Sequence, residues 1–117
     1  MTSIELRSDN AAGTAPEIVE AIAEANVGTA LAYGDDELTA HLHDVVRAVF
    51  DHPTARVFPV TSGTAANALS LSALCPPWGA VLCHETAHIL NSEGGATSLL
   101  AAGAVMRGVP GDGFQMS

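Results

Sequence analysis

Short apolar runs alternate along this sequence with stretches of helical periodicity, and this alternation constrains the fold more than any other feature. The apolar runs predict strands at residues 56–60, 80–83 and 104–108. The periodic stretches predict helices at 14–26, 36–52, 63–74 and 92–101. Strands that alternate with helices are typical of an α/β fold with a mainly parallel sheet, and we expect that class here.

Several residues predict where these elements begin and weaken. Thr14 is expected to cap the first helix, and Asp35 or Asp36 the second. The apolar residues of both helices share one face, which we expect to point inward. Pro59 indicates that the first strand lies at an edge or a strand end, and the pair Gly94–Gly95 weakens the last helix.

The charge excludes two classes of partner. The net charge is -9 and the four arginines are scattered, so neither a nucleic acid nor an anionic membrane is an expected partner. No basic region precedes an apolar run at the N-terminus, and no apolar stretch is long enough to span a membrane. We therefore expect a soluble cytoplasmic protein, with Cys75 and Cys83 as buried thiols rather than a disulfide.

All four basic residues are arginine, so the chain contains no lysine and cannot form a lysine Schiff base within itself. Aromatic residues make up only 4% of the chain, and abundant alanine predicts close packing through small side chains. The last predicted strand is followed by a turn-rich segment, residues 111–117, with no closing element. That ending favours a truncated domain.

The segment 61–67, placed between a predicted strand and a helix, is the first candidate site. Gly63 allows an anion to approach the backbone, Ser62 and Thr64 carry hydroxyl donors, and the free amides of the helix start point outward. This pattern indicates a phosphate cradle. The simpler alternative is that Ser62 or Thr64 only caps a helix. A P-loop lysine and the spaced glycines of a dinucleotide turn are both absent.

The second candidate site is the segment 83–88, which follows a predicted strand. His84 and His88, four positions apart with Glu85 between them, match the zinc-protease pattern HExxH. That pattern needs one continuous helix through both histidines, whereas the run before His84 is predicted to be a strand. An active-site or packing role is favoured over metal ligation, and we predict no metal site.

Two further polar clusters, residues 6–10 and 33–36, are typical of turns and caps when each is taken alone. Their order along the chain gives them more weight. The segments LRSDN, ANxGTAxxYGDDELT, FPVTSGTAANALSLSAL and GAVLCHETAHILNSEGGA resemble, in this order and spacing, the threonine aldolase and β-eliminating lyase family. The resemblance covers almost the whole chain.

The resemblance implies the fold type I architecture of pyridoxal-phosphate enzymes, in which a large domain with a mixed seven-stranded sheet holds the cofactor. Active sites in that architecture form at a dimer interface, so a homo-oligomer, dimer or tetramer, is expected. Residues 1–117 would be the N-terminal part of the cofactor-binding large domain, with no second domain.

The resemblance also implies roles for individual residues. Ser62, Gly63 and Thr64 would hold the phosphate of pyridoxal 5'-phosphate, in agreement with the pattern of the segment itself. His88 matches the histidine that stacks on the pyridine ring near the substrate's β-hydroxyl, and Glu93 an acidic residue that helps to organise it.

Three more positions match substrate-binding segments of the family. Ser8 matches a serine that approaches the substrate carboxylate. Tyr33 and Asp35 lie in a segment that comes near the active site of the same or a neighbouring subunit.

The implied activity is the aldol cleavage of β-hydroxy-α-amino acids, such as L-threonine or L-allo-threonine, to glycine and an aldehyde. In the family the Schiff-base lysine, the aspartate that pairs with the pyridine nitrogen, and the carboxylate-binding arginines lie further along. We therefore expect the isolated chain to be inactive. Three alternatives stay open: another fold type I lyase or transaminase, a truncated fragment that only binds phosphate or self-associates, and, more distantly, a zinc-dependent hydrolase.

Overall fold

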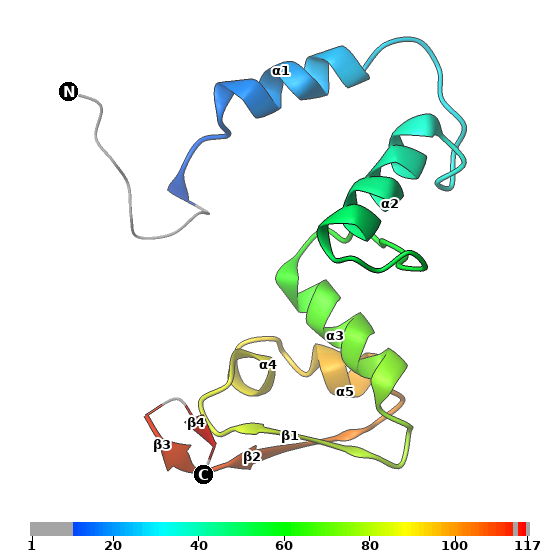
Figure 1. Cartoon of the computed structure of the whole chain (residues 1–117). Coiled ribbons are helices and arrows are strands. Elements are labelled where there is room, and N and C mark those ends of the chain that lie inside the picture. The colour runs from blue at the N-terminus through cyan, green and yellow to red at the C-terminus, as the bar shows by residue number, and fades with distance from the viewer. Residues whose placement is uncertain (1–10, 114, 117) are drawn as a thin grey trace, which may run out of the picture. The chain divides into compact units, whose positions relative to one another are not determined.

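The computed structural model describes residues 11–113 and 115–116 (Figure 1). Its contacts divide the chain into a first unit that ends at Val57 and a second that begins at Phe58. Ser8, one of the predicted substrate-binding residues, lies outside the described residues.

The first unit contains two helices, α1 (Pro16–Ala25) and α2 (Glu37–Val49). The prediction that Thr14 caps α1 is wrong, because the capping position is Ala15, which makes no side-chain cap bond. A residue before proline is held in an extended conformation, and this places the helix start at Pro16. The prediction for α2 is confirmed at Asp36, whose carboxylate accepts a 2.8 Å hydrogen bond from the Thr39 amide.

The apolar faces of α1 and α2 are exposed in this unit, although the sequence predicts that they point inward. Neither helix has a buried residue, and Ile22, Leu38 and Val45 are all exposed. A helix buries its apolar stripe only where a second layer packs on it. The described residues of this unit supply no such layer.

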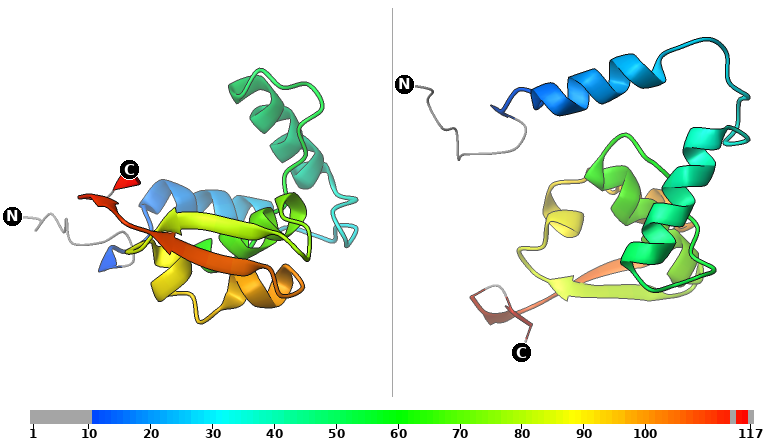
Figure 2. Two further views of the ribbon diagram at one scale, coloured as in Figure 1. Left: turned by 90° about the horizontal axis from the view of Figure 1, so that it is seen from below. Right: turned by 45° about the horizontal axis from the view of Figure 1, so that its top comes forward.

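The second unit contains helix α3 (Gly63–Leu74), strand β1 (Ala80–His84), short helices α4 (His88–Asn91) and α5 (Ala96–Leu100), and strand β2 (Val105–Val109). The two strands are parallel, and their register pairs Ala80 with Val105 and His84 with Val109. The three helices lie on one side of this strand pair (Figures 1 and 2). The predicted α/β arrangement with parallel strands is thus confirmed here.

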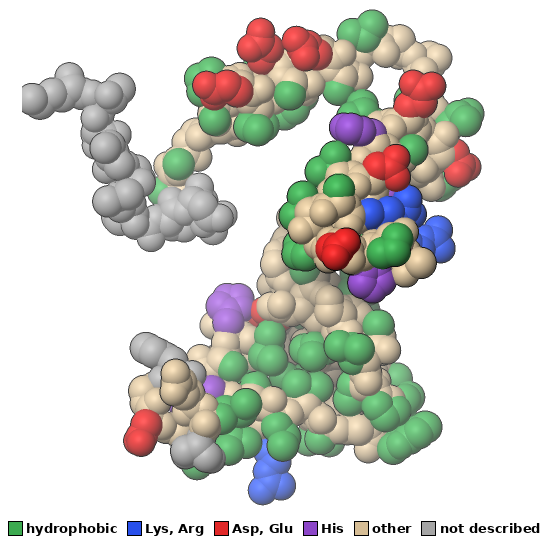
Figure 3. All heavy atoms as spheres, in the orientation of Figure 1, with side chains coloured by type: hydrophobic (Ala, Val, Ile, Leu, Met, Phe, Trp, Pro, Cys, Tyr) green, Lys and Arg blue, Asp and Glu red, His purple; other side chains and the backbone are tan. Residues whose placement is uncertain are grey.

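Small side chains form the core of the second unit. Ala68 of α3, Thr97 of α5 and the adjoining Ala101 and Ala104 are buried, together with Cys83 of β1. Such residues allow α3 and α5 to approach closely, as the alanine-rich composition predicts. Many larger apolar side chains remain at the surface (Figure 3). Leu82 of β1 and Val105 of β2 are among the exposed ones.

Two predicted elements are wrong. Residues 56–60 form no strand, because a strand needs a paired neighbour, Pro59 has no amide to donate, and no described strand pairs with this segment. The helix predicted at 92–101 is instead two short helices. Gly94 and Gly95 separate them with φ angles of 58° and 79°, in the left-handed region that stops a helix.

The C-terminal segment contains one feature that the sequence analysis does not predict. Strands β3 (Gly111–Asp112) and β4 (Gln115–Met116) pair in antiparallel fashion as a short hairpin. Of the helices that the structure describes, none combines the length and the apolar composition that crossing a membrane requires.

Candidate active site

The N-terminus of α3 is an open, donor-rich surface. Ser62 caps the helix, since its Oγ accepts a 3.2 Å hydrogen bond from the Ala65 amide and its carbonyl accepts one of 3.1 Å from Ala66. The next two amides, of Gly63 and Thr64, donate to no other residue in the described part of the chain. A Cβ added at Gly63 would meet nothing within 4 Å.

These features suit an anion. The positive end of a twelve-residue helix and two free amides face open space, and Ser62 and Thr64 add hydroxyls. The cap and the cradle were alternatives in the sequence. The structure shows that Ser62 does cap the helix by accepting from Ala65 and Ala66. The amides of Gly63 and Thr64 stay free of this cap.

His88 and Glu93 form the second part of the site. His88 begins α4, and its Nδ1 atom lies 2.9 Å from Oε1 of Glu93, which lies in the turn between α4 and α5. The Glu93 side chain is fully buried, whereas the His88 side chain is 69% exposed. The imidazole is therefore held at one nitrogen and open at the other.

Asn67 joins this pair from α3, and no role was predicted for it. Its Nδ2 donates a 2.7 Å hydrogen bond to the same Oε1 atom of Glu93. The residue lies within the motif 61–67, but a helical asparagine looks the same in sequence whether it faces solvent or a carboxylate 26 positions away. Only its placement on the face of α3 near α4 and α5 reveals the contact.

Two hydrogen bonds hold the pKa of Glu93 below its usual range, and the one from Asn67 has the larger effect, followed by the one from His88. The side chain is therefore a carboxylate at neutral pH and can only accept hydrogen bonds. It follows that Nδ1 of His88 carries the proton in this contact. In the neutral imidazole, Nε2 then has the free lone pair and is available to accept a proton from a ligand.

The structure separates the two histidines of the HExxH match. His84 ends β1 and is buried, while His88 begins α4, so no continuous helix carries both. The His84 Nδ1 atom accepts a 3.2 Å hydrogen bond from the Thr86 amide. In the described ranges no cluster of three His, Cys, Asp or Glu side chains is arranged to hold a metal ion.

Tyr33 and Asp35 lie in the first unit. Tyr33 is fully exposed and has a φ of 65°, a conformation unusual for a bulky residue. Asp35 lines an open pocket of about 430 Å³ near the start of α2. Their approach to the residues of the second unit stays a prediction.

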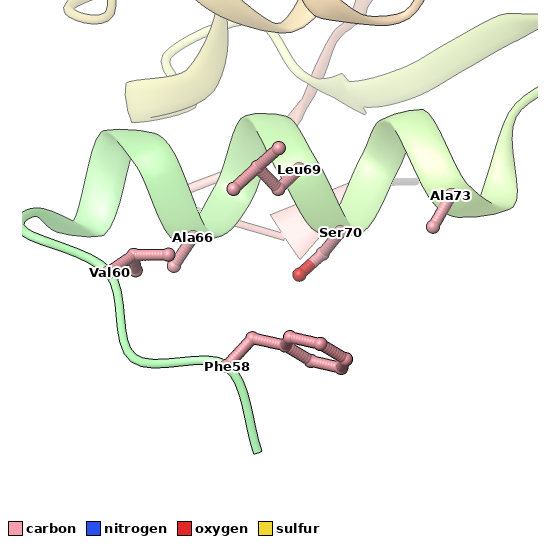
Figure 4. A pocket seen from close by; sticks show the side chains of 6 residues that line it. All are labelled: Phe58, Val60, Ala66, Leu69, Ser70 and Ala73. Atoms are coloured by element: carbon pink, nitrogen blue, oxygen red, sulfur yellow. The ribbon is translucent and has the colours of Figure 1, made fainter. Parts of the chain in front are cut away.

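One face of α3 forms an apolar groove of about 510 Å³ with the segment before the helix (Figure 4). The groove is lined by Phe58, Val60, Ala66, Leu69, Ser70 and Ala73. It contains none of the predicted site residues, which lie at the helix start and around Glu93. Cys75 and Cys83 are free thiols, as predicted, although only Cys83 is buried.

Comparison with known proteins decides the family of the chain. The sequence profile of a family described as beta-eliminating lyase matches residues 5–117. The chain belongs to the beta-eliminating lyase family.

Curated relatives of this beta-eliminating lyase chain share one name. The low specificity L-threonine aldolase of Pseudomonas aeruginosa is 44% identical over 100 residues, which cover 86% of this chain and 29% of the relative. The enzyme of the same name from a Pseudomonas species is 38% identical over 115 residues, or 98% of this chain and 33% of the relative. The chain thus spans about a third of the length of these relatives.

A solved structure supports the same fold. The beta-eliminating lyase chain matches threonine aldolase of Leishmania major with a TM-score of 0.80 and 26% identity, over 90% of this chain and 30% of that one. The predicted fold class, an α/β structure that corresponds to part of a fold type I enzyme, is confirmed by this match.

Proposed function

We propose that this chain contributes the phosphate cradle and a proton-accepting histidine to a pyridoxal-phosphate enzyme that cleaves β-hydroxy-α-amino acids. L-threonine or L-allo-threonine would be cleaved to glycine and acetaldehyde. One observation carries the proposal. The buried Glu93 carboxylate joins His88 to Asn67, and Asn67 lies one turn beyond the open N-terminus of the same helix.

The residues at the start of α3 fit the cofactor's phosphate. A phosphate needs several hydrogen-bond donors, and the amides of Gly63 and Thr64 together with the Ser62 and Thr64 hydroxyls provide them. Open space at Gly63 admits the anion close to the backbone. The helix dipole supplies positive potential without a lysine.

When bound, pyridoxal phosphate supplies an electron sink that allows a bond at the amino acid's Cα to break. His88 performs two roles in this proposal. Its exposed ring would stack on the cofactor, and its Nε2 atom would accept the proton of the substrate's β-hydroxyl. Glu93 stabilises the imidazolium that results, since its carboxylate accepts the hydrogen bond from Nδ1.

Ser8, Tyr33 and Asp35 are proposed to contact the substrate, Ser8 at its carboxylate. The resemblance to the family supports these roles. The same resemblance supports a homo-oligomer, dimer or tetramer, in the cytoplasm, and the assignment of residues 1–117 to the N-terminal part of the cofactor-binding domain.

The lack of lysine limits what the isolated chain can do. With no lysine in its 117 residues, it cannot hold the cofactor through a lysine Schiff base. We therefore propose that the activity needs residues that this sequence does not contain. A chimera tests the function: this chain replaces the matching third of the Pseudomonas aeruginosa relative, and threonine cleavage is assayed.

We expect the chimera to cleave threonine and the His88→Ala chimera to be slower by roughly 10²–10⁴-fold in kcat. An active chimera that is indifferent to His88→Ala would contradict the role of His88. A folded chimera that binds the cofactor's phosphate but cleaves no β-hydroxy-α-amino acid would favour the non-catalytic alternative, and one that acts on other amino acids would favour another lyase or a transaminase.

A further inference from the structure

Asn67 is bonded to a residue far along the chain. From the middle of α3, its side-chain amide donates to Oε1 of Glu93 over 2.7 Å, across 26 positions of sequence. Asn67 follows Thr64 by one helical turn, so it lies on the same rigid helix as the phosphate cradle. It is the only residue of α3 that makes a side-chain hydrogen bond to Glu93 among the described residues.

The carboxylate that receives this bond has few other partners. The Glu93 side chain is fully buried, Oε1 is shared by Asn67 and His88, and Oε2 has no partner among the described residues. A buried charge is costly unless donors surround it. With only two donors, the orientation of this carboxylate depends strongly on each of them.

The packing of the second unit also has contributions that do not involve this hydrogen bond. Ala68 of α3 and Thr97 of α5 are fully buried, and Ala104 is almost fully buried. These small side chains allow α3 to pack on α5. Asn67 itself is an exposed residue. Its removal is therefore expected to leave the fold intact while it changes the environment of Glu93.

We propose that Asn67 is a positioning residue that holds Oε1 of Glu93 where it fixes His88 as the Nδ1-protonated tautomer, with Nε2 free for a ligand. Because Asn67 and the cradle share α3, the same contact sets the distance between the phosphate site and the histidine. This inference extends the proposed function, on which its catalytic meaning rests. The tautomer itself depends on neither cofactor nor substrate.

The tautomer of His88 can be measured directly in the full 117-residue chain. Nitrogen-15 NMR of the neutral imidazole distinguishes a protonated from an unprotonated ring nitrogen, with no cofactor present. In the unaltered chain we expect the chemical shift of a protonated nitrogen at Nδ1 and that of an unprotonated nitrogen at Nε2. The opposite pattern would overturn the proposal at once.

Variants of Asn67 test its part in this pattern. Asn67→Ala should move the chemical shifts of both ring nitrogens toward those of a free imidazole, in which the two tautomers are mixed. Asn67→Gln, which retains an amide donor, should restore part of the unaltered pattern. Ser72→Ala is the matched control on α3, since Ser72 bonds only the carbonyl of Leu69 among the described residues. It should leave both resonances unchanged.

A folded Asn67→Ala chain with the unaltered tautomer pattern would overturn the proposal, as would an equal change in Ser72→Ala. If Asn67→Ala does not fold, Asn67→Leu keeps a branched side chain of similar size without a donor or a charge, and the same shift is expected from it. An unchanged tautomer in Asn67→Leu would also overturn the proposal. The measurement stays valid if the chimera proves inactive, so the two hypotheses fail separately.

Discussion

The imidazole of His88 is bonded through Nδ1 to a carboxylate, Glu93, that is completely buried, while the rest of the ring faces outward. One ring nitrogen, Nδ1, is therefore held in a hydrogen bond, and the other, Nε2, is free. It resembles the base-and-orienter geometry of catalytic histidines in general, where the carboxylate selects the tautomer and stabilises the charged ring.

The first prediction concerns this pair. Glu93→Gln removes the negative charge and should lower the kcat of the chimera by roughly 10²–10⁴-fold, because the imidazolium loses its stabilising partner. Threonine cleavage measures the effect. Glu85→Gln, a change at an exposed carboxylate next to the strand end, is the control and should leave kcat unchanged. Equal losses in both variants would show a structural effect only.

A second prediction separates the two roles of Ser62. Ser62→Asp preserves helix capping, since Asp and Ser cap equally well, but places a negative charge at the cradle. We expect an unchanged free energy of unfolding and a loss of pyridoxamine 5'-phosphate binding, measured by NMR titration. That ligand lacks the aldehyde that would react with the N-terminal amine. Ser62→Ala should instead lower stability by about 1 kcal/mol.

If Ser62→Asp binds the ligand as well as the unaltered chain does, then α3 has a cap but no cradle. Pyridoxamine, which lacks the phosphate, is the matched ligand control. It should bind neither protein.

A third prediction uses two glycines with opposite surroundings. A Cβ at Gly108 of β2 would lie 3.0 Å from Leu90 Cδ2 and 3.1 Å from Glu85 Cα, whereas one at Gly63 would meet nothing. Gly108→Ala should therefore destabilise the chain by roughly 1–3 kcal/mol in denaturant unfolding. Gly63→Ala should fold normally yet bind pyridoxamine 5'-phosphate about tenfold more weakly, a loss of about 1.4 kcal/mol, because the methyl group enters the cradle. The reverse ranking of stability would refute this account of the two sites.

The fourth prediction concerns pH. Asn67 and His88 hold the pKa of Glu93 below its usual range, and the backbone and side chain of Thr39 do the same for Asp36. A lowered folded-state pKa contributes stability above the unfolded value, which is about 4 for these residues, and the contribution is lost as pH falls through the folded value. The chain should therefore lose stability as pH falls below about 5.

Carbon-13 NMR of the carboxyl groups measures each pKa directly. Asn67→Ala should raise the pKa of Glu93 and leave that of Asp36 unchanged. Thr39→Val should raise the pKa of Asp36, because the hydroxyl donor is lost, and leave that of Glu93 unchanged. Each variant thus controls for the other. A Glu93 that titrates at its usual value in the unaltered chain would contradict the hydrogen-bond assignment.

Much of the local structure was determined by the sequence. The limits of α3 were predicted to the residue, and β1 and β2 to within about one, because caps, prolines and apolar runs act over a few neighbouring positions. The open helix start at Gly63 and Thr64 follows from the same local rules. The family motifs also predict His88 and Glu93 as site residues.

Contacts between distant positions were decided by tertiary structure alone. The segment 56–60 has the composition of a strand but no described partner to pair with, and the apolar faces of α1 and α2 have no layer to cover them. Asn67 acquires its role only because folding brings α3 beside Glu93. Helix caps and turns depend on neighbours in sequence, whereas strand pairing, burial and the charge state of a carboxylate depend on neighbours in space.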